Sequence, residues 1–142
     1  MSHATNYLEN AIGNALFMGQ PLPAITEWHI ALFTAAPNED GTGGAEVSAV
    51  ETGYARQRLD PGPDAWAKKP AQDSTGRTVF YNIMAVSFPA ATLNGWGALS
   101  HFGLFNQSGD LCYLAPLASV RTINQGDLGP SFLAGELEFA IG

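Results

Sequence analysis

The sequence predicts a mainly β fold, an antiparallel β-sandwich or barrel-like domain with a short N-terminal α-helix. Three observations support this fold class. Short apolar runs with a period of two residues recur from residue 28 onward. Turn signals such as "DPGPD", "NQSGD" and "NQGD" separate these runs, in a chain with 16 glycines and 9 prolines. Only the N-terminal segment follows a helical period.

The first element is expected to be a helix within an N-terminal segment, residues 1–22. One apolar stripe runs along it, formed by Tyr7, Leu8, Ala11, Ile12, Ala15 and Leu16. Asn6 with Glu9 resembles a capping box, and Gly19 and Pro21 supply the stop. Because so short a helix is marginal in water, its stripe must pack on the domain or on a neighbouring chain.

Residues 23–142 are expected to form a single β domain. The first strand lies in "TEWHIALFT", residues 26–34, and both of its faces are largely apolar, which predicts a central strand packed on both sides. "LFNQSGDLCYL" predicts a hairpin. Further strands are expected at residues 54–59, 78–83, 85–88, 97–105, 111–117, 119–123 and 135–141.

The last strand alternates between apolar and mostly polar residues. Leu137, Phe139 and Ile141 are expected to point inward. Their neighbours are expected to point outward: Glu136, Glu138 and Ala140.

The longest irregular segment is expected to be a loop at residues 60–77. A long loop in a compact domain is usually functional or ordered by a partner. This one carries Trp66, which we expect to be exposed and to lie in an interface.

Composition indicates a surface covered by other chains. Charged residues make up 13% of the sequence, about half the share in a typical soluble domain. The alternative is a monomer coated with uncharged polar side chains. The net charge is −7 and the six Lys and Arg residues are scattered, which argues against nucleic-acid binding. No apolar run has the length of a membrane span and no signal peptide is recognisable, so we expect a soluble product without membrane association.

Tests for chemistry predict no catalytic, cofactor-binding or metal-binding residues, and no cofactor. The loop "NEDGTGG" lacks the Gly-Lys-Ser/Thr of a phosphate-binding loop, and its spacing does not match an EF-hand. Two alternatives stay open: a calcium site in that loop, and a zinc or hydrolase site that uses His29 and His101. Glu136 and Glu138 are read as solvated charges rather than a glycosidase pair. Cys112 is read as a buried apolar residue.

Two sets of residues are singled out for later comparison. The candidate interface consists of the helix stripe, the loop after the first strand and the long loop: Tyr7, Leu8, Ile12, Leu16, Pro37, Asn38, Glu39, Asp40 and Trp66. The loop after the first strand is interpreted as a connector that rims a contact between subunits. The candidate ion pair joins Arg56 to an acid such as Glu46 or Asp127, because an interface arginine normally forks onto a carboxylate.

An ordered set of motifs along most of the chain resembles a family of small tailed-bacteriophage virion proteins often labelled "phage tail fibre protein". The pieces that carry the resemblance are "ALFT" at 31–34, "EVS" at 46–48, "GYARQ" at 53–57, "FP" at 88–89, "WG" at 96–97, "HFG" at 101–103 and "GD" at 126–127.

The resemblance implies a non-enzymatic structural part of a phage particle, located in the virion and assembled in the host cytoplasm. The chain has no repeat or coiled coil from which to build a fibre shaft. We therefore favour an accessory protein that decorates or cements the capsid surface, as a homo-oligomer, for which we guess a trimer, on the major capsid protein. The alternative is a tail-fibre or baseplate module that contacts a host receptor or glycan, with Trp66 at its tip.

Overall fold

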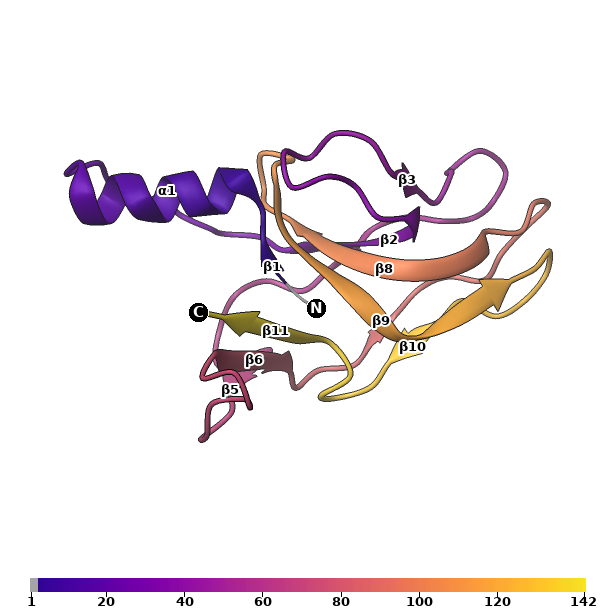
Figure 1. Ribbon diagram of the computed structural model, residues 1–142. Coiled ribbons are helices and arrows are strands. Elements are labelled where there is room, and N and C mark those ends of the chain that lie inside the picture. The colour runs from indigo at the N-terminus through magenta and orange to yellow at the C-terminus, as the bar shows by residue number, and fades with distance from the viewer. Residues whose placement is uncertain (1–2) are drawn as a thin grey trace.

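The computed structural model describes residues 3–142 (Figure 1). A six-stranded antiparallel sheet forms one layer. Its strands follow the order β1 (His3–Ala4), β9 (Leu111–Ile123), β8 (Gly97–Phe105), β2 (His29–Ala35) and β3 (Ala45–Glu46), and β4 (Gln57–Arg58) also pairs with β2. The predicted mainly β, antiparallel fold is confirmed, and the sheets in the described residues do not close into a barrel.

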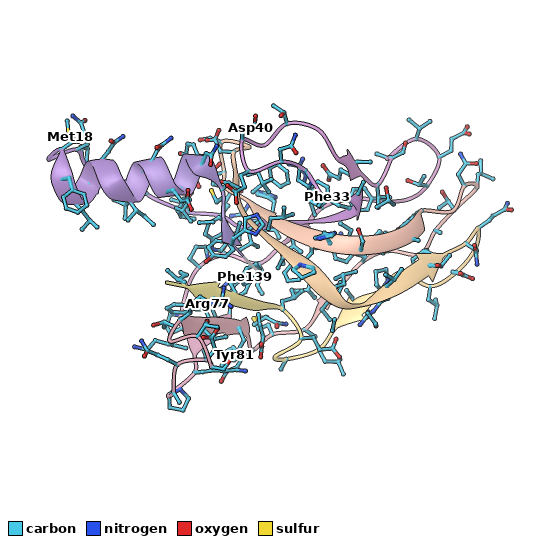
Figure 2. The ribbon with its side chains drawn as sticks, in the orientation of Figure 1. Met18, Phe33, Asp40, Arg77, Tyr81 and Phe139 are labelled. Atoms are coloured by element: carbon cyan, nitrogen blue, oxygen red, sulfur yellow. The ribbon has the colours of Figure 1, made fainter. Side chains whose placement is uncertain are left out.

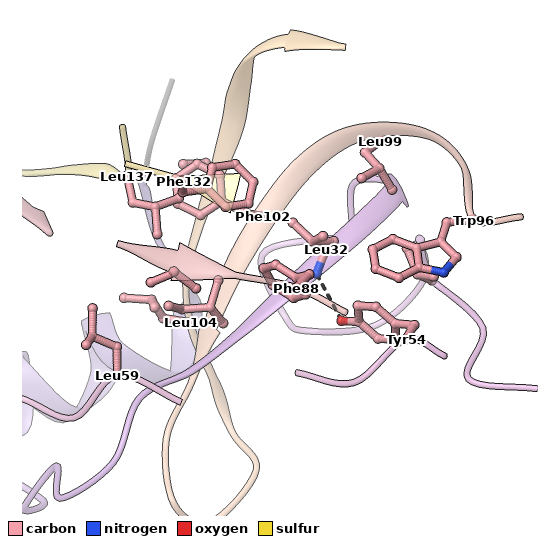
Figure 3. Close-up of a cluster of buried hydrophobic side chains, with 14 of the residues drawn as sticks. Leu32, Tyr54, Leu59, Phe88, Trp96, Leu99, Phe102, Leu104, Phe132 and Leu137 are labelled. Carbon is pink, nitrogen blue, oxygen red and sulfur yellow. Dashed lines mark hydrogen bonds between the residues drawn. The ribbon is translucent and has the colours of Figure 1, made fainter. Parts of the chain in front are cut away.

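Two smaller antiparallel sheets lie against one face of the large sheet (Figure 1). One has the order β11 (Glu138–Ile141), β6 (Thr78–Asn82) and β5 (Trp66–Lys68), and the other pairs β10 (Ser131–Phe132) with β7 (Val86–Ser87). The main core fills the space between the layers (Figure 3). Most of its aromatic pairs meet edge to face, for example Phe102 with Phe139 at 5.2 Å between centroids, whereas Tyr54 and Phe88 are stacked.

Strand β2 is packed on both sides, as predicted. Ile30 and Leu32 point into the main core, and Ala31 and Phe33 belong to a second apolar cluster on the opposite face. All four side chains are at most 4% exposed. The position of β2 inside the large sheet accounts for this double burial, since β8 pairs along one of its edges and β3 and β4 along the other.

The predicted hairpin is formed by β8 and β9, with a turn at residues 106–110. The two runs predicted at 111–117 and 119–123 are one strand in the structure, β9. Pro116 does not interrupt it, because β1 pairs only with Tyr113 and Leu114 and leaves no partner in this sheet on that side of Pro116. An irregular register between Leu99 and His101 takes up the mismatch with β8.

The end of β11 differs from the predicted alternation. Ala140 was expected outside but is buried, and Ile141 was expected inside but is 46% exposed. Ala140 is small and lies opposite Val79 of β6, whereas Ile141 stands at the end of the chain below α1. Alternation fixes the direction of each side chain but not what covers it.

The helix α1 spans Asn6–Phe17 and begins differently from the prediction. Its N-cap is Thr5, and no side chain caps the helix, so the capping box of Asn6 and Glu9 is wrong. The Thr5 hydroxyl instead donates to the carbonyl of Leu111, and the Thr5 N–H donates to the carbonyl of Cys112. These bonds to β9 tie the start of the helix to the large sheet.

The segment 60–77 is partly regular rather than a loop throughout. It contains β5, which pairs with β6, and the amide of Trp66 donates to the carbonyl of Gly62. Its second half is a turn in which the carboxylate of Asp73 accepts hydrogen bonds from the amides of Thr75 and Arg77. These contacts order the segment within the chain itself.

Candidate interaction surfaces

The helix α1 projects from the sheets and carries apolar side chains into solvent (Figures 1 and 2). None of its residues is buried. Leu16 is 70% exposed, Phe17 84% and Met18, just past the helix, 69%. We call residues 6–18 the arm. Of the predicted interface residues, Ile12 and Leu16 lie on this exposed arm, and Tyr7 and Leu8 are half-buried at its base.

An apolar notch lies under the arm. Its volume is about 270 Å³, and its walls come from α1, the connector to β2, strands β5 and β11 of a smaller sheet, and strands β8 and β9 of the large sheet. We define the notch by Leu22, Ile25, Trp28, Trp66, Phe139 and Ile141, and it is also lined by Tyr7, Leu8 and Ile12 at the base of the arm. No charged side chain lines it among the residues that the structure describes.

Trp66 forms part of the notch rather than an exposed loop tip. Its side chain is half-buried, its Nε1 donates to the carbonyl of Leu59 at 3.2 Å, and its ring meets Phe139 edge to face. The expectation of an exposed Trp66 is therefore wrong, because β5 turns this side chain back toward the core. The sequence signal for burial was weak, since the surrounding prolines and lysines read as a surface loop.

The connector from the end of β2 to β3, residues 36–44, is built as a self-contained turn. Pro37 is buried, whereas Asn38, Glu39 and Asp40 are exposed. The Asp40 carboxylate accepts hydrogen bonds from the amide and hydroxyl of Thr42, which lower its pKa. The Glu39 carbonyl accepts a bond from the amide of Asn6 at 2.9 Å. This loop therefore contacts the base of the arm.

Arg56 and Glu46 form a two-pronged ion pair at the edge of the large sheet. Arg56 donates from Nε and Nη2 to the two carboxylate oxygens of Glu46, at 2.9 and 2.8 Å, and its guanidinium lies 3.7 Å above the ring centre of Phe105. Asp127, the other acid considered for Arg56, lies elsewhere and accepts a bond from the amide of Asn124.

Tyr54 completes this cluster and was not predicted. Its hydroxyl donates to Glu46 at 2.7 Å and accepts the amide N–H of Leu32 at 3.0 Å (Figure 3). Leu32 lies on β2 between the stretches that pair with β3 and β4, so the hydroxyl fills a gap in the ladder. No local pattern signals this role, because Tyr54, Leu32 and Glu46 come from separate segments of the chain.

Protonation in this cluster follows from burial and charge. Burial acts to raise the pKa of Glu46, but the hydrogen bonds from Arg56 and Tyr54 and the Arg56 charge outweigh it, so the pKa is lowered. Burial, together with the bond to Glu46, raises the pKa of Tyr54. Tyr54 therefore keeps its proton and Glu46 its charge at neutral pH.

Three loops, residues 47–56, 88–96 and 124–130, lie at the end of the molecule opposite to the arm (Figure 1) and carry a second set of exposed apolar side chains. We call it the distal surface and define it by Val50, Leu93 and Leu128, which are 72%, 65% and 84% exposed. Backbone hydrogen bonds hold its three loops together: Asn94 donates to Glu51, and Ala91 donates to Asp127.

Comparison with known proteins identifies the family. A family model described as "Gp80: Podophage GP4 fiber I protein gp80" matches residues 3–140. The chain belongs to this family. It is therefore a phage fibre protein, a structural component of the virion, as the ordered motifs predicted. No curated protein matched the chain.

The two histidines considered for a zinc or hydrolase site in this fibre protein, His29 and His101, lie apart. His29 opens β2 opposite Phe105, and His101 lies opposite Phe33 of β2, which places them four residues or about 13 Å apart along the strand. His29 bonds to Glu27 and His101 to Ser100. In residues 3–142 no three His, Cys, Asp or Glu side chains gather as a metal site, and no helix is long and apolar enough to span a membrane.

Proposed function

We propose that this protein is a non-enzymatic, accessory part of the phage tail fibre that joins neighbouring virion chains through the arm and the distal surface. The observation that carries the proposal is that each of these two opposite ends of the molecule carries three large apolar side chains that are at least 65% exposed. Exposed apolar patches rimmed by polar residues mark protein contacts. A part with a contact surface at each end is suited to bridging.

The fibre is favoured over the capsid surface by the family description. The described residues provide a single helix of 12 residues, far too short for a coiled-coil shaft. The protein therefore acts as a globular joint or end piece on a shaft supplied by other chains. A decoration role on the major capsid protein, as a trimer, uses the same surfaces and is the competing outcome of the test below.

Direct contact with a host glycan is less well supported than the bridging role. The glycan hypothesis placed Trp66 at the tip of a long loop, whereas the structure has Trp66 in the notch under the arm.

The expected division of the chain at residue 22 does not separate two independent parts, because β1 within the N-terminal segment pairs with β9 of the β domain. We propose one folded unit from which only the arm projects.

The test is to locate the chain on intact virions by electron cryomicroscopy and to count its copies by quantitative mass spectrometry. The proposal expects a few copies at the tail fibres. Many copies on the capsid lattice would replace it with the decoration role, and absence from the particle would refute both.

A matched pair of variants tests the two surfaces. Leu93→Asp places a charge on the distal surface and is expected to reduce incorporation into particles. Leu133→Asp introduces the same charge at a side chain that is 61% exposed and belongs to neither surface, and is expected to incorporate normally. Equal incorporation of both variants would remove the distal surface from the proposal.

A further inference from the structure

We propose that the arm of each copy packs into the notch of another copy, so that the protein assembles with itself by exchanging arms. This inference rests on the proposed function only in treating the arm as a contact surface. It names the partner of that surface, a second copy of this chain, and the place where the arm is received.

The arm needs a cover that its own domain does not provide. A helix of 12 residues is marginal in water unless an apolar face is buried. Only the base of the arm packs on the core, through the half-buried Leu8. The far end, with Leu16, Phe17 and Met18, points away from the sheets (Figure 2). Its stability as a helix therefore depends on another chain.

The notch is a preformed receptor for such an arm. Its outer wall is the connector between α1 and β2, which has no regular secondary structure. Gln107, in the turn between β8 and β9, holds this connector by donating to the carbonyl of Ala24 at 2.7 Å and accepting from the amide of Thr26 at 3.1 Å. The wall that carries Leu22 and Ile25 is thus fixed before a partner binds.

Charge favours a second copy at this place. Each copy has a net charge of −7, so two copies repel each other unless they meet where acids are absent. Residues 10–26, which include most of the arm and the outer wall of the notch, contain no Asp, Glu, Lys, Arg or His. The lining of the notch among the described residues is uncharged as well. Two copies can therefore meet through the arm and the notch without bringing their acidic side chains together.

The available area also favours exchange over one-way docking. With the exposures of Ile12, Leu16, Phe17 and Met18, one arm offers roughly 500 Å² of apolar surface. A stable interface buries about 800 Å² on each partner. One arm docked on an unrelated chain falls short of this. In a closed pair or ring every copy gives an arm and receives one, so each copy buries the surface of its own notch in addition to that of its arm.

The first test is sedimentation of the purified full chain over a concentration series. We expect a closed oligomer, a dimer or a trimer, that dissociates on dilution. Phe17→Asp is expected to raise the dissociation constant by roughly 10- to 100-fold or more, since it removes a buried aromatic side chain from each contact. Leu93→Asp, the matched control on the distal surface, is expected to leave it unchanged. A monomer at all concentrations, or equal effects of the two variants, would overturn the proposal.

The second test asks whether the contact forms between chains at the place proposed. Phe17→Cys and Ile141→Cys are made in separate, differently tagged chains, mixed and oxidised; the native Cys112 is buried and does not compete. We expect a disulfide between the two kinds of chain, and the control mixture of Leu93→Cys with Ile141→Cys gives none. Failure to form the mixed disulfide overturns the arm exchange. Particle incorporation of Leu93→Asp is a separate readout, so a failed proposed function is recognised independently.

Discussion

Replacing Tyr54 by Phe tests the idea that one hydroxyl completes the ladder of the large sheet. The change removes only the oxygen that bonds Leu32 and Glu46. The ring keeps its place against Phe88 and Trp96, at 6.1 and 5.5 Å between centroids, so no cavity opens. The effect on stability therefore reports the two hydrogen bonds alone.

The expected loss comes mainly from Leu32. This residue is fully buried, and its amide N–H would be left without an acceptor, which costs about 1–3 kcal/mol. Glu46 keeps both bonds from Arg56 and is partly exposed, so the lost Tyr54 bond adds about 1 kcal/mol or less. We expect the free energy of unfolding to fall by about 1–4 kcal/mol.

The assay is urea unfolding at pH 7, followed by tryptophan fluorescence at one fixed protein concentration, since self-association shifts apparent stability. Tyr81→Phe, at a half-buried tyrosine on β6, is the matched control and is expected to change the free energy by less than about 0.5 kcal/mol. If Tyr54→Phe were as stable as the control, the hydroxyl would not be needed to complete the ladder, and the reasoning would be wrong.

Three further predictions concern the pH response, one turn and the buried thiol. The pKa of Glu46 is lowered in the folded state, so its ion pair stabilises the fold above the ordinary Glu pKa of about 4.5, and this contribution is lost as the pH falls through the folded value. The free energies of unfolding of wild type and Glu46→Gln should therefore converge between pH 7 and pH 3. A constant difference between them would contradict this. Gly44→Ala should lower the free energy of unfolding by at least about 2 kcal/mol, because Gly44 has φ +68° and a Cβ would lie 2.5 Å from the nitrogen of Pro37. The control Gly41→Ala, at φ +83° with open space around the position, should lower it by about 1 kcal/mol. Similar melting curves for the two variants would refute the steric argument. Cys112 is fully buried, and burial raises its pKa to about 11. A thiol reagent at pH 8 should therefore label it only after unfolding in denaturant. One equivalent of label in native buffer would contradict its burial.

Local patterns predicted the elements whose cause is local. The two apolar faces of β2 follow from uninterrupted hydrophobicity in Ile30, Ala31, Leu32 and Phe33, and the turn after Phe105 follows from its residue types. These features depend on period and turn chemistry, which a sequence displays directly.

Long-range contacts decided the rest. Thr5 is the N-cap but its hydroxyl is taken by a carbonyl more than a hundred residues away, which no capping rule anticipates. Trp66 looked exposed because its neighbours are polar, yet β5 turns it toward Phe139. In the candidate site, the apolar stripe of the arm was visible in the sequence as a helical period. The notch beside it could be found only in the folded structure, because its walls come from six separate segments.

The gap at Tyr54 also bears on whether further strands can add to the edge of the large sheet. A long exposed edge strand offers a row of free N–H and C=O groups on which further chains add without limit. Here the outer edge of the large sheet consists of β3 and β4, two residues each, and a side-chain hydroxyl takes the N–H between them. Strand addition finds no continuous template at this edge. In a chain with only 13% charged residues, contacts with other chains at this edge must therefore come from side chains rather than from added strands.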